Sequence, residues 1–191
     1  GLAGGSNLWL QNSIGTALVV HELGHNYGIG HSNLWLTTNG SIIGTGTSQE
    51  YGDDFDVMGD GDVPIDHFSA AQKAKVDWLA TSDWVAPSTS QTVRLYGGDY
   101  GESLQNPRGV RLTKSGSTQF YWLTYRPRSS NAAMKHGLHL AWVRGTHDLL
   151  DTIPSTSGDV SDAGLTLGRT YSDTAAGVHV TPLSRGGTVP N

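Results

Sequence analysis

The sequence contains no cysteine among its 191 residues. This absence excludes disulfide bonds, cysteine-ligated zinc and a cysteine nucleophile. Long apolar runs are missing too, since no stretch approaches the roughly 18 residues that a membrane-spanning helix needs. Basic residues are scarce, because 12 Lys and Arg stand against 17 Asp and Glu and leave a net charge of −5. A nucleic-acid-binding protein is therefore disfavoured.

Aromatic side chains are well represented, with six Trp, seven Tyr and three Phe. They supply core material, so a disordered chain is disfavoured and one domain or two small domains are expected. Glycine is abundant (26 residues), whereas only four Lys and three Glu occur. This composition is more typical of an exported protein than of a cytosolic one, and we expect a secreted, extracellular location.

Charge is divided unevenly along the chain. Residues 1–86 carry two Lys against ten acids, a net charge of −8, and residues 87–191 carry ten bases against seven acids, a net charge of +3. The difference predicts two units that meet near Pro87. For residues 1–86, helices are predicted over 14–27 and 69–79, where Ser69 and Gln72 have the spacing of a capping box.

The regions around these helices are predicted from turn residues and short apolar runs. A short strand is expected over 7–10, and residues 32–62 are expected to be mostly loop. Beyond Pro87, turn residues separate short strand-like runs, a pattern that predicts an antiparallel β-sandwich-like module and an α+β fold overall. These runs are 92–96, 109–113, 120–125, 138–143, 164–167 and 177–181.

The most informative stretch is 21–31, which reads His-Glu-Leu-Gly-His-Asn-Tyr-Gly-Ile-Gly-His. His21 and His25 are four residues apart, so on a helix their rings lie one turn apart on one face. Gly28 tolerates positive φ and allows the chain to turn, which returns His31 to the same point. Three imidazoles form an open site for one catalytic zinc ion, and Glu22 is placed to take a proton from water.

Chance does not readily produce this pattern. The shorter string HExxH is only suggestive, but five specified positions at about one in twenty each reduce chance matches to roughly 10⁻⁴. Copper or cobalt would also suit imidazole ligands.

The eleven-residue string resembles HExxHxxGxxH, the signature of the metzincin metallopeptidases. Metzincins also carry a Met-turn below the zinc, and Met58 within Asp56-Val57-Met58-Gly59 is similar to it. Residues 50–59 look most like the gametolysin-type peptidases, which cleave extracellular-matrix or cell-wall proteins. Ser32 after the third histidine is also seen in matrixins. Asp60 stands where astacins and serralysins place a tyrosine ligand, so no such ligand is implied.

This resemblance implies a zinc-dependent endopeptidase that acts on protein or peptide substrates. His21, His25 and His31 would be the metal ligands, Glu22 the general base and Met58 the support beneath the site. Metzincins have a multi-stranded sheet before the active-site helix, whereas only thirteen residues precede the helix predicted here. We therefore expect the polypeptide to begin further upstream, and zinc chemistry rather than full activity from this chain alone.

Six aspartates surround Met58, at positions 53, 54, 56, 60, 62 and 66. Their spacing does not fit an EF-hand, so a solvated acidic loop is favoured over a calcium site, with Asp56 as the residue expected to hold the Met-turn backbone. Tyr27 and Tyr51 are predicted to pack rather than to act in the cleft. Five further histidines lack ligand spacing and are predicted to be structural: His67, His136, His139, His147 and His179.

A non-catalytic, zinc-stabilised binding module is the alternative function. In that case residues 87–191 would contact protein or polysaccharide, and exposed tryptophans such as Trp84 or Trp142 would matter more than Glu22. Glu22 speaks against this alternative, because a structural zinc site needs no base and closes its fourth position with a ligand.

Overall fold

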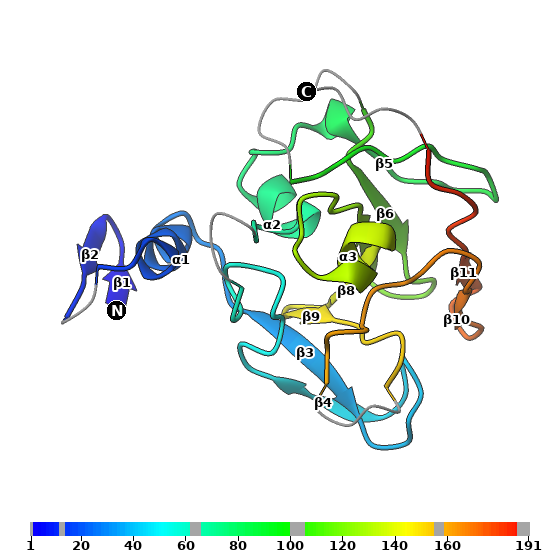
Figure 1. Ribbon diagram of the computed structural model, residues 1–191, viewed down its shortest axis with the longest axis horizontal. Helices are drawn as coiled ribbons and strands as arrows, with labels where there is room; N and C mark the ends of the chain where they lie inside the picture. Colours follow the sequence, from blue (N-terminus) through cyan, green and yellow to red (C-terminus); the bar gives the residue numbers. More distant parts are fainter. Residues whose placement is uncertain (1, 12–13, 62–65, 100–105, 155–158, 187–191) are drawn as a thin grey trace.

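The computed structural model describes residues 2–11, 14–61, 66–99, 106–154 and 159–186. The fold is α+β, and its centre is a mixed sheet of seven strands in the order β4-β3-β9-β8-β7-β6-β5 (Figure 1). Neighbouring strands are antiparallel except for the parallel pairs β3–β9 and β5–β6. The strands are β3 (Ser32–Thr37), β4 (Gly46–Gln49), β5 (Trp84–Val85), β6 (Gly109–Thr113), β7 (Phe120–Thr124), β8 (His139–Val143) and β9 (His147–Leu149).

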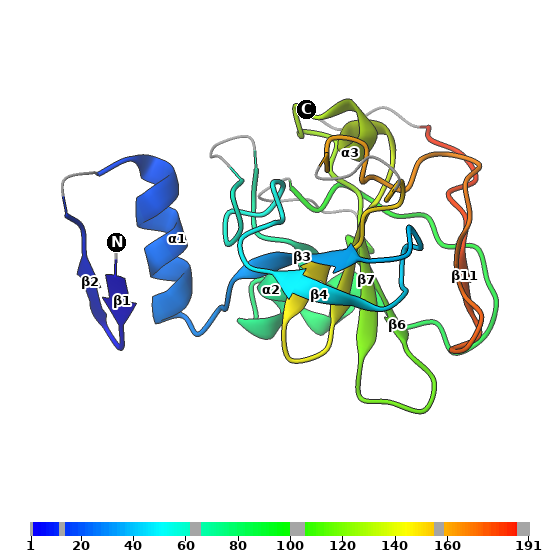
Figure 2. The same cartoon turned by 90° about the horizontal axis from the view of Figure 1, so that it is seen from below.

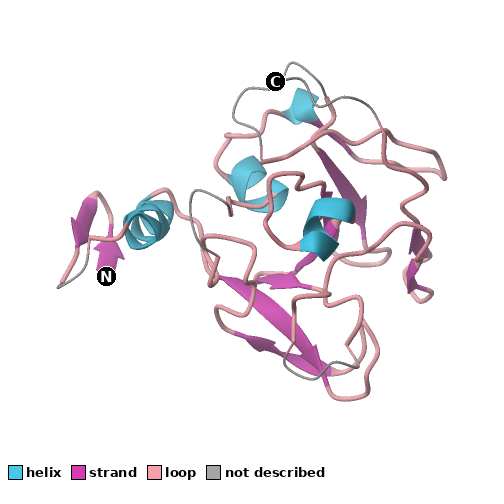
Figure 3. Ribbon diagram, viewed as in Figure 1, coloured by secondary structure: helices cyan, strands magenta, loops and turns pink. Residues whose placement is uncertain are grey.

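The remaining elements are short and lie around this sheet, with long loops between them (Figure 3). Two hairpins are separate from it, β1–β2 and β10–β11. None of the described helices is long and apolar enough to cross a membrane. These elements are β1 (Leu2–Gly4), β2 (Asn7–Trp9), α1 (Thr16–Asn26), α2 (Ala70–Lys75), the 3₁₀ helix η1 (Thr81–Asp83), α3 (Ala132–His136), β10 (Tyr171–Asp173) and β11 (Val178–Val180).

The seven-stranded sheet draws strands from both sides of Pro87. β3, β4 and β5 precede that residue, and β6 to β9 follow it. The expectation of a separate β-sandwich-like module over 87–191 is therefore wrong. The longest described strands of this region join one sheet with strands from the first 86 residues. The physical reason is strand pairing, because β9 and β6 hydrogen-bond to strands that would otherwise be left with an open edge.

Several expected elements are confirmed and others are wrong. α1 and α2 lie within the two predicted helices, and Ser69 Oγ accepts a hydrogen bond from Gln72 N at 3.3 Å as the N-cap of α2. The reciprocal bond of a capping box is not formed, because Ser69 N donates to Asp56 Oδ2 instead. β6, β7, β8 and β11 lie in predicted runs. The runs 92–96 and 164–167 are not strands, and the expected loop over 32–62 contains β3 and β4.

Two apolar clusters hold the sheet and α1 in place. The larger one lies against the β6–β7–β8 part of the sheet and includes Tyr121, Leu123 and Leu140, all at most 2% exposed. A smaller cluster of Ile29, Val57, Met58 and Phe68, joined by Val20 of α1, lies between α1 and the loop that carries Met58. This smaller cluster attaches α1, which with the β1–β2 hairpin lies to one side of the sheet (Figures 1 and 2).

Candidate metal centre

Three histidines are brought together where α1 gives way to β3. α1 supplies His21 and His25 one turn apart. The helix ends because Gly28 adopts a φ of 84°, as expected for a glycine that must reverse the chain. His31 then directly precedes β3, and one ring nitrogen from each of the three lies within 4.8 Å of the others. The predicted convergence of the three rings is thus present.

Each of the three rings is held by its other nitrogen. His21 Nδ1 donates to Val57 O at 2.8 Å, and His25 Nδ1 donates to Ile29 O at 2.9 Å. His31 Nδ1 donates to Glu50 Oε1 at 2.7 Å. Each of these bonds is made by Nδ1, and a hydrogen bond from the non-ligating nitrogen to a carbonyl or carboxylate oxygen is the arrangement found in metal-binding histidines.

The distances between the rings fit a shared cation. His25 Nε2 and His31 Nε2 are 3.0 Å apart, within hydrogen-bond distance and close to the spacing of two ligands on one ion. Nitrogens that ligate one tetrahedral zinc are about 3.3 Å apart. Burial, together with the neighbouring rings of His25 and His31, lowers the pKa of His21, so this ring is neutral and its lone pair is available at neutral pH.

Glu22 lies beside the cluster on α1. It is only 6% exposed, and its position one residue after His21 turns it about 100° around the helix axis from that ring. Its charge acts on both His21 and Tyr51. A buried carboxylate next to the ligands, and offset from them, is suited to a base rather than to a ligand.

Met58 lies directly under the helix that carries the first two histidines. Its side chain is fully buried, and a Cβ at Gly24 would collide with its Sδ, so only glycine at that position lets α1 approach this closely. Asp56 fixes the turn, because its Oδ1 accepts from Met58 N at 2.9 Å and its Oδ2 accepts from Ser69 N at 2.8 Å. Asp56 therefore has the backbone contacts that the sequence predicted.

Glu50 and Tyr51 also belong to the centre, although no spacing rule in the sequence identifies them. The Tyr51 ring packs 4.0 Å from the His31 ring and 5.9 Å from the His21 ring, as expected, although Tyr51 is still 44% exposed. Its φ of 62° is uncommon for a residue other than glycine. Asn33 Oδ1 holds this backbone by accepting from Tyr51 N at 3.2 Å.

A second group of ligand-type side chains is buried, in the loop that carries Met58 and in β9. Asp53, Asp56 and His147 place one ligand-type atom each within 4.8 Å of one another. Asp53 and Asp56 are fully buried, so the expected solvated acidic loop is wrong for these two residues. Asp54 and Asp60 are exposed, and Asp62 lies outside the described residues.

Histidines from β8 and β9 explain how these aspartates are buried. His139 Nε2 donates to Asp53 Oδ2 at 2.8 Å, and His147 Nε2 pairs with Ser69 Oγ at 2.9 Å. Burial opposes ionisation of Asp53, but the attraction and hydrogen bond of His139 outweigh it and hold the pKa of that carboxyl below its usual range. Both histidines thus have the structural character that the sequence predicted, with contacts that no spacing indicated.

The tryptophans proposed for a binding surface are covered. Trp84 is half-buried under Arg111, whose guanidinium lies 4.5 Å from its ring centre. Trp142 is half-buried under Arg144 at 4.6 Å. They do not form the exposed aromatic surface that the alternative function requires.

Comparison of the chain with protein-family models, with curated proteins and with solved structures finds no match.

Proposed function

We propose that this chain carries the metal centre of a zinc-dependent endopeptidase, with His21, His25 and His31 as ligands and Glu22 as general base. The observation that supports this most is the orientation of the three rings. Each Nδ1 is occupied by a carbonyl or carboxylate oxygen, and the Nε2 atoms of His25 and His31 face each other at 3.0 Å. Hydrogen bonds of this kind orient the rings of metal-binding histidines, and a buried carboxylate beside an open metal site is what a catalytic centre needs.

The chemistry follows from the residues around the centre. A zinc ion held by the three rings would polarise a substrate carbonyl and lower the pKa of a water molecule. Glu22 accepts the proton of the attacking water and returns it to the amine that leaves. The Tyr51 side chain lies against the ligand rings, where its hydroxyl is available to hydrogen-bond a substrate oxygen.

The finer assignment is to the metzincins, and within them to the gametolysin type. It is supported by the succession of a helix with two ligands, a glycine turn, a third ligand and a buried methionine under the helix. Under this proposal the substrates are proteins of the extracellular matrix or cell wall, and the enzyme acts outside the cell. The covered Trp84 and Trp142 weigh against the non-catalytic binding module.

Replacement of Glu22 by Gln tests the proposal. Zinc content should stay at one ion per chain, and hydrolysis of a quenched fluorescent peptide library should fall by about 10²- to 10⁴-fold, because proton transfer in the transition state is lost. Asp54→Asn is the matched control, since Asp54 is an exposed acid outside the cluster, and its turnover should be unchanged. Equal turnover by Glu22→Gln and the unmodified chain would contradict the assignment.

A further inference from the structure

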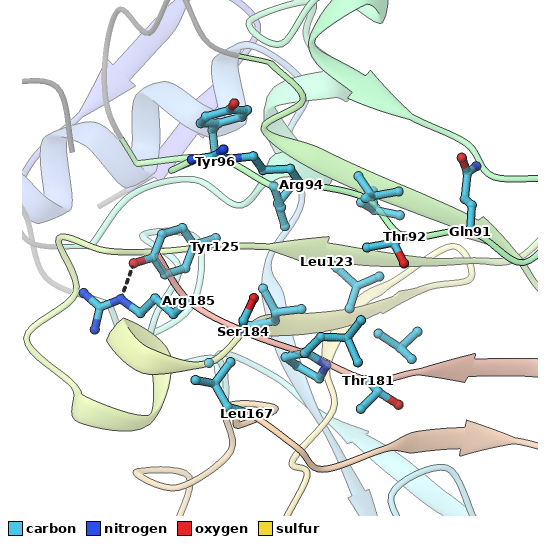
Figure 4. A pocket seen from close by; sticks show the side chains of 18 of the residues that line it. Gln91, Thr92, Arg94, Tyr96, Leu123, Tyr125, Leu167, Thr181, Ser184 and Arg185 are labelled. Carbon is cyan, nitrogen blue, oxygen red and sulfur yellow. Dashed lines mark hydrogen bonds between the residues drawn. The ribbon is translucent and has the colours of Figure 1, made fainter. Parts of the chain in front are cut away.

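A cavity of about 770 Å³ lies at the end of the molecule opposite α1. Its floor is formed by side chains of β6 and β7, one wall by residues 87–97, and the other by β11 and the residues after it (Figure 4). This volume is within the range of sites that bind small molecules. None of the residues of the histidine cluster lines it.

The middle of the cavity is aliphatic. Leu112 and Leu123 belong to the floor, and Val93 and Val180 belong to the two walls. Leu167 and Leu183 are 45% and 70% exposed and add further apolar surface at the rim. Exposed leucines beside an aliphatic cavity indicate a surface that gains stability when an apolar molecule covers it.

The charges around the cavity have one sign. Arg94 and Arg185 line it together with His136 and His179, whereas no Asp or Glu occurs among the described lining residues of a chain that is acidic overall. Elsewhere in the described structure, arginines bind carboxylates directly, as Arg108 binds Asp83 at 2.5 Å. Neither arginine of the cavity forms such an ion pair with a described acid, which makes the cavity complementary to an anion.

One end of the cavity is built to receive the anionic group. Arg185 Nε donates to Tyr125 Oη at 2.8 Å, and its Nη1 contacts His136 Nδ1. These contacts fix the guanidinium and leave its other N–H groups to bind a carboxylate. Figure 4 shows Tyr96, Tyr125 and Arg185 at this end, Leu123 toward the middle and Gln91 toward the other end.

The backbone of the cavity floor favours an aliphatic chain over a peptide as the ligand. β6 is paired with β7, and β7 is paired on its other side with β8, so the backbone groups of the floor are occupied. An extended peptide lying on this floor would contact apolar side chains but no unpaired backbone groups of β7, so its amide groups facing the floor would lose their hydrogen bonds to water. A hydrocarbon chain has no such requirement.

We infer that this cavity binds a linear aliphatic carboxylate, with its chain over Leu123 and its carboxylate at Arg185. The site is separate from the proposed metal centre and does not depend on the peptidase assignment. Its ligand is defined by chemistry, as a hydrocarbon tail that ends in one negative charge.

Calorimetric titration of the chain with decanoate, below its micelle concentration, tests the inference. We expect one bound decanoate per chain, and much weaker binding of decyltrimethylammonium, which has the same tail and the opposite charge. Arg185→Gln should weaken decanoate binding about tenfold or more through loss of the charged hydrogen bonds. Lys135→Gln is the charge control, because Lys135 is exposed nearby on α3 and does not line the cavity, and it should bind decanoate unchanged.

Further variants distinguish binding in the cavity from binding elsewhere on the chain. Ser184→Trp places a large side chain in the cavity and should abolish binding, whereas Thr118→Trp, at an exposed position outside the cavity, should not. His25→Ala removes a proposed metal ligand and should bind decanoate as the unmodified chain does. The inference is overturned if decanoate does not bind or if Arg185→Gln and Ser184→Trp bind it normally. The inference is also overturned if His25→Ala no longer binds decanoate, because that result would place the carboxylate on the metal.

Discussion

The two groups of ligand-type side chains differ in the hydrogen-bond partners of their nitrogen and oxygen atoms. In the cluster of His21, His25 and His31, each ring uses one nitrogen for a hydrogen bond and directs the other toward its neighbours. In the group formed by Asp53 and Asp56 with His147, backbone N–H groups and histidine nitrogens already bind the carboxylates.

Charge separates the two groups as well. Arg126 and Lys73 are buried beside the aspartates at 1% and 6% exposure, and Arg126 Nη2 donates to His67 O at 3.0 Å. His139 and His147 attract the carboxylate of Asp53, and the charges of Asp56 and Lys73 attract each other, so neighbouring side chains of the fold already balance these carboxylates. The histidine cluster contains no cation of its own. Proximity of ligand-type atoms alone is therefore a weak criterion for a metal site, and unfilled lone pairs are a stronger one.

The largest expected effect is on zinc affinity, and it distinguishes the two groups when one histidine is removed from each. His25→Ala should lower zinc affinity by about a thousandfold, since a third of the protein ligands is lost. His147→Ala should leave both the affinity and the stoichiometry of one zinc per chain unchanged. Competition with a fluorescent chelator measures both. A second zinc ion bound by the unmodified chain and lost in His147→Ala would reverse the comparison.

Replacing the buried pair of Asp53 and His139 should change the free energy of unfolding rather than zinc binding. Asp53→Ala leaves the buried His139 without its partner and should lower the free energy of unfolding by about 3–5 kcal/mol, measured by urea denaturation. The double variant Asp53→Leu with His139→Leu should be more stable than either single leucine variant, because it buries no unpaired charge. If the single variants are as stable as the unmodified chain, the Asp53–His139 pair does not support the loop that carries Met58.

Glu50 should produce an intermediate effect at the metal. Its carboxylate orients His31 through Nδ1, so Glu50→Gln should weaken zinc binding by about 10- to 100-fold while all three ligands remain. Asp54→Asn changes a nearby exposed charge without touching a ligand and serves as control. An equal loss of affinity in both variants would mean that Glu50 acts only through its charge.

The smallest effect is on the pH dependence of stability. Burial, together with Lys73 and Arg126, lowers the pKa of His67 to about 4. Between about pH 4 and pH 6.5 the unfolded chain binds a proton at His67 that the folded chain excludes, so stability falls as pH decreases through this window. The slope is about 1 kcal/mol per pH unit, and His67→Gln should reduce it in urea denaturation of metal-free protein.

The elements that could be predicted from sequence are those determined locally. α1 follows from apolar residues around a helix, and α2 from the Ser69 cap, because each depends on neighbours within one or two turns. The ligand cluster is local in the same sense, since residues 21–31 contain all three histidines. Met58 needed the family resemblance, because a lone methionine has no distinguishing pattern.

The elements that escaped prediction depend on distant partners. β3 pairs with the nearby β4 along one edge, but its other edge pairs with β9, more than a hundred residues later, so Ser32 lies opposite His147. The burial of Asp53 likewise depends on His139, which is 86 residues away in sequence. Glu50 and Tyr51 reach the ligands by a turn held through Asn33. Composition and periodicity carry no information about such pairings.

The division of the ligands between α1 and the entrance to β3 has a mechanical consequence. Two ligands belong to a helix that lies to one side, and the third is continuous with the central sheet (Figure 2). A bound ion would thus link α1 to the central sheet, in addition to the packing of Met58 against the helix. Amide hydrogens of α1 should then exchange faster after chelation, while those of the β7–β8 ladder keep their protection.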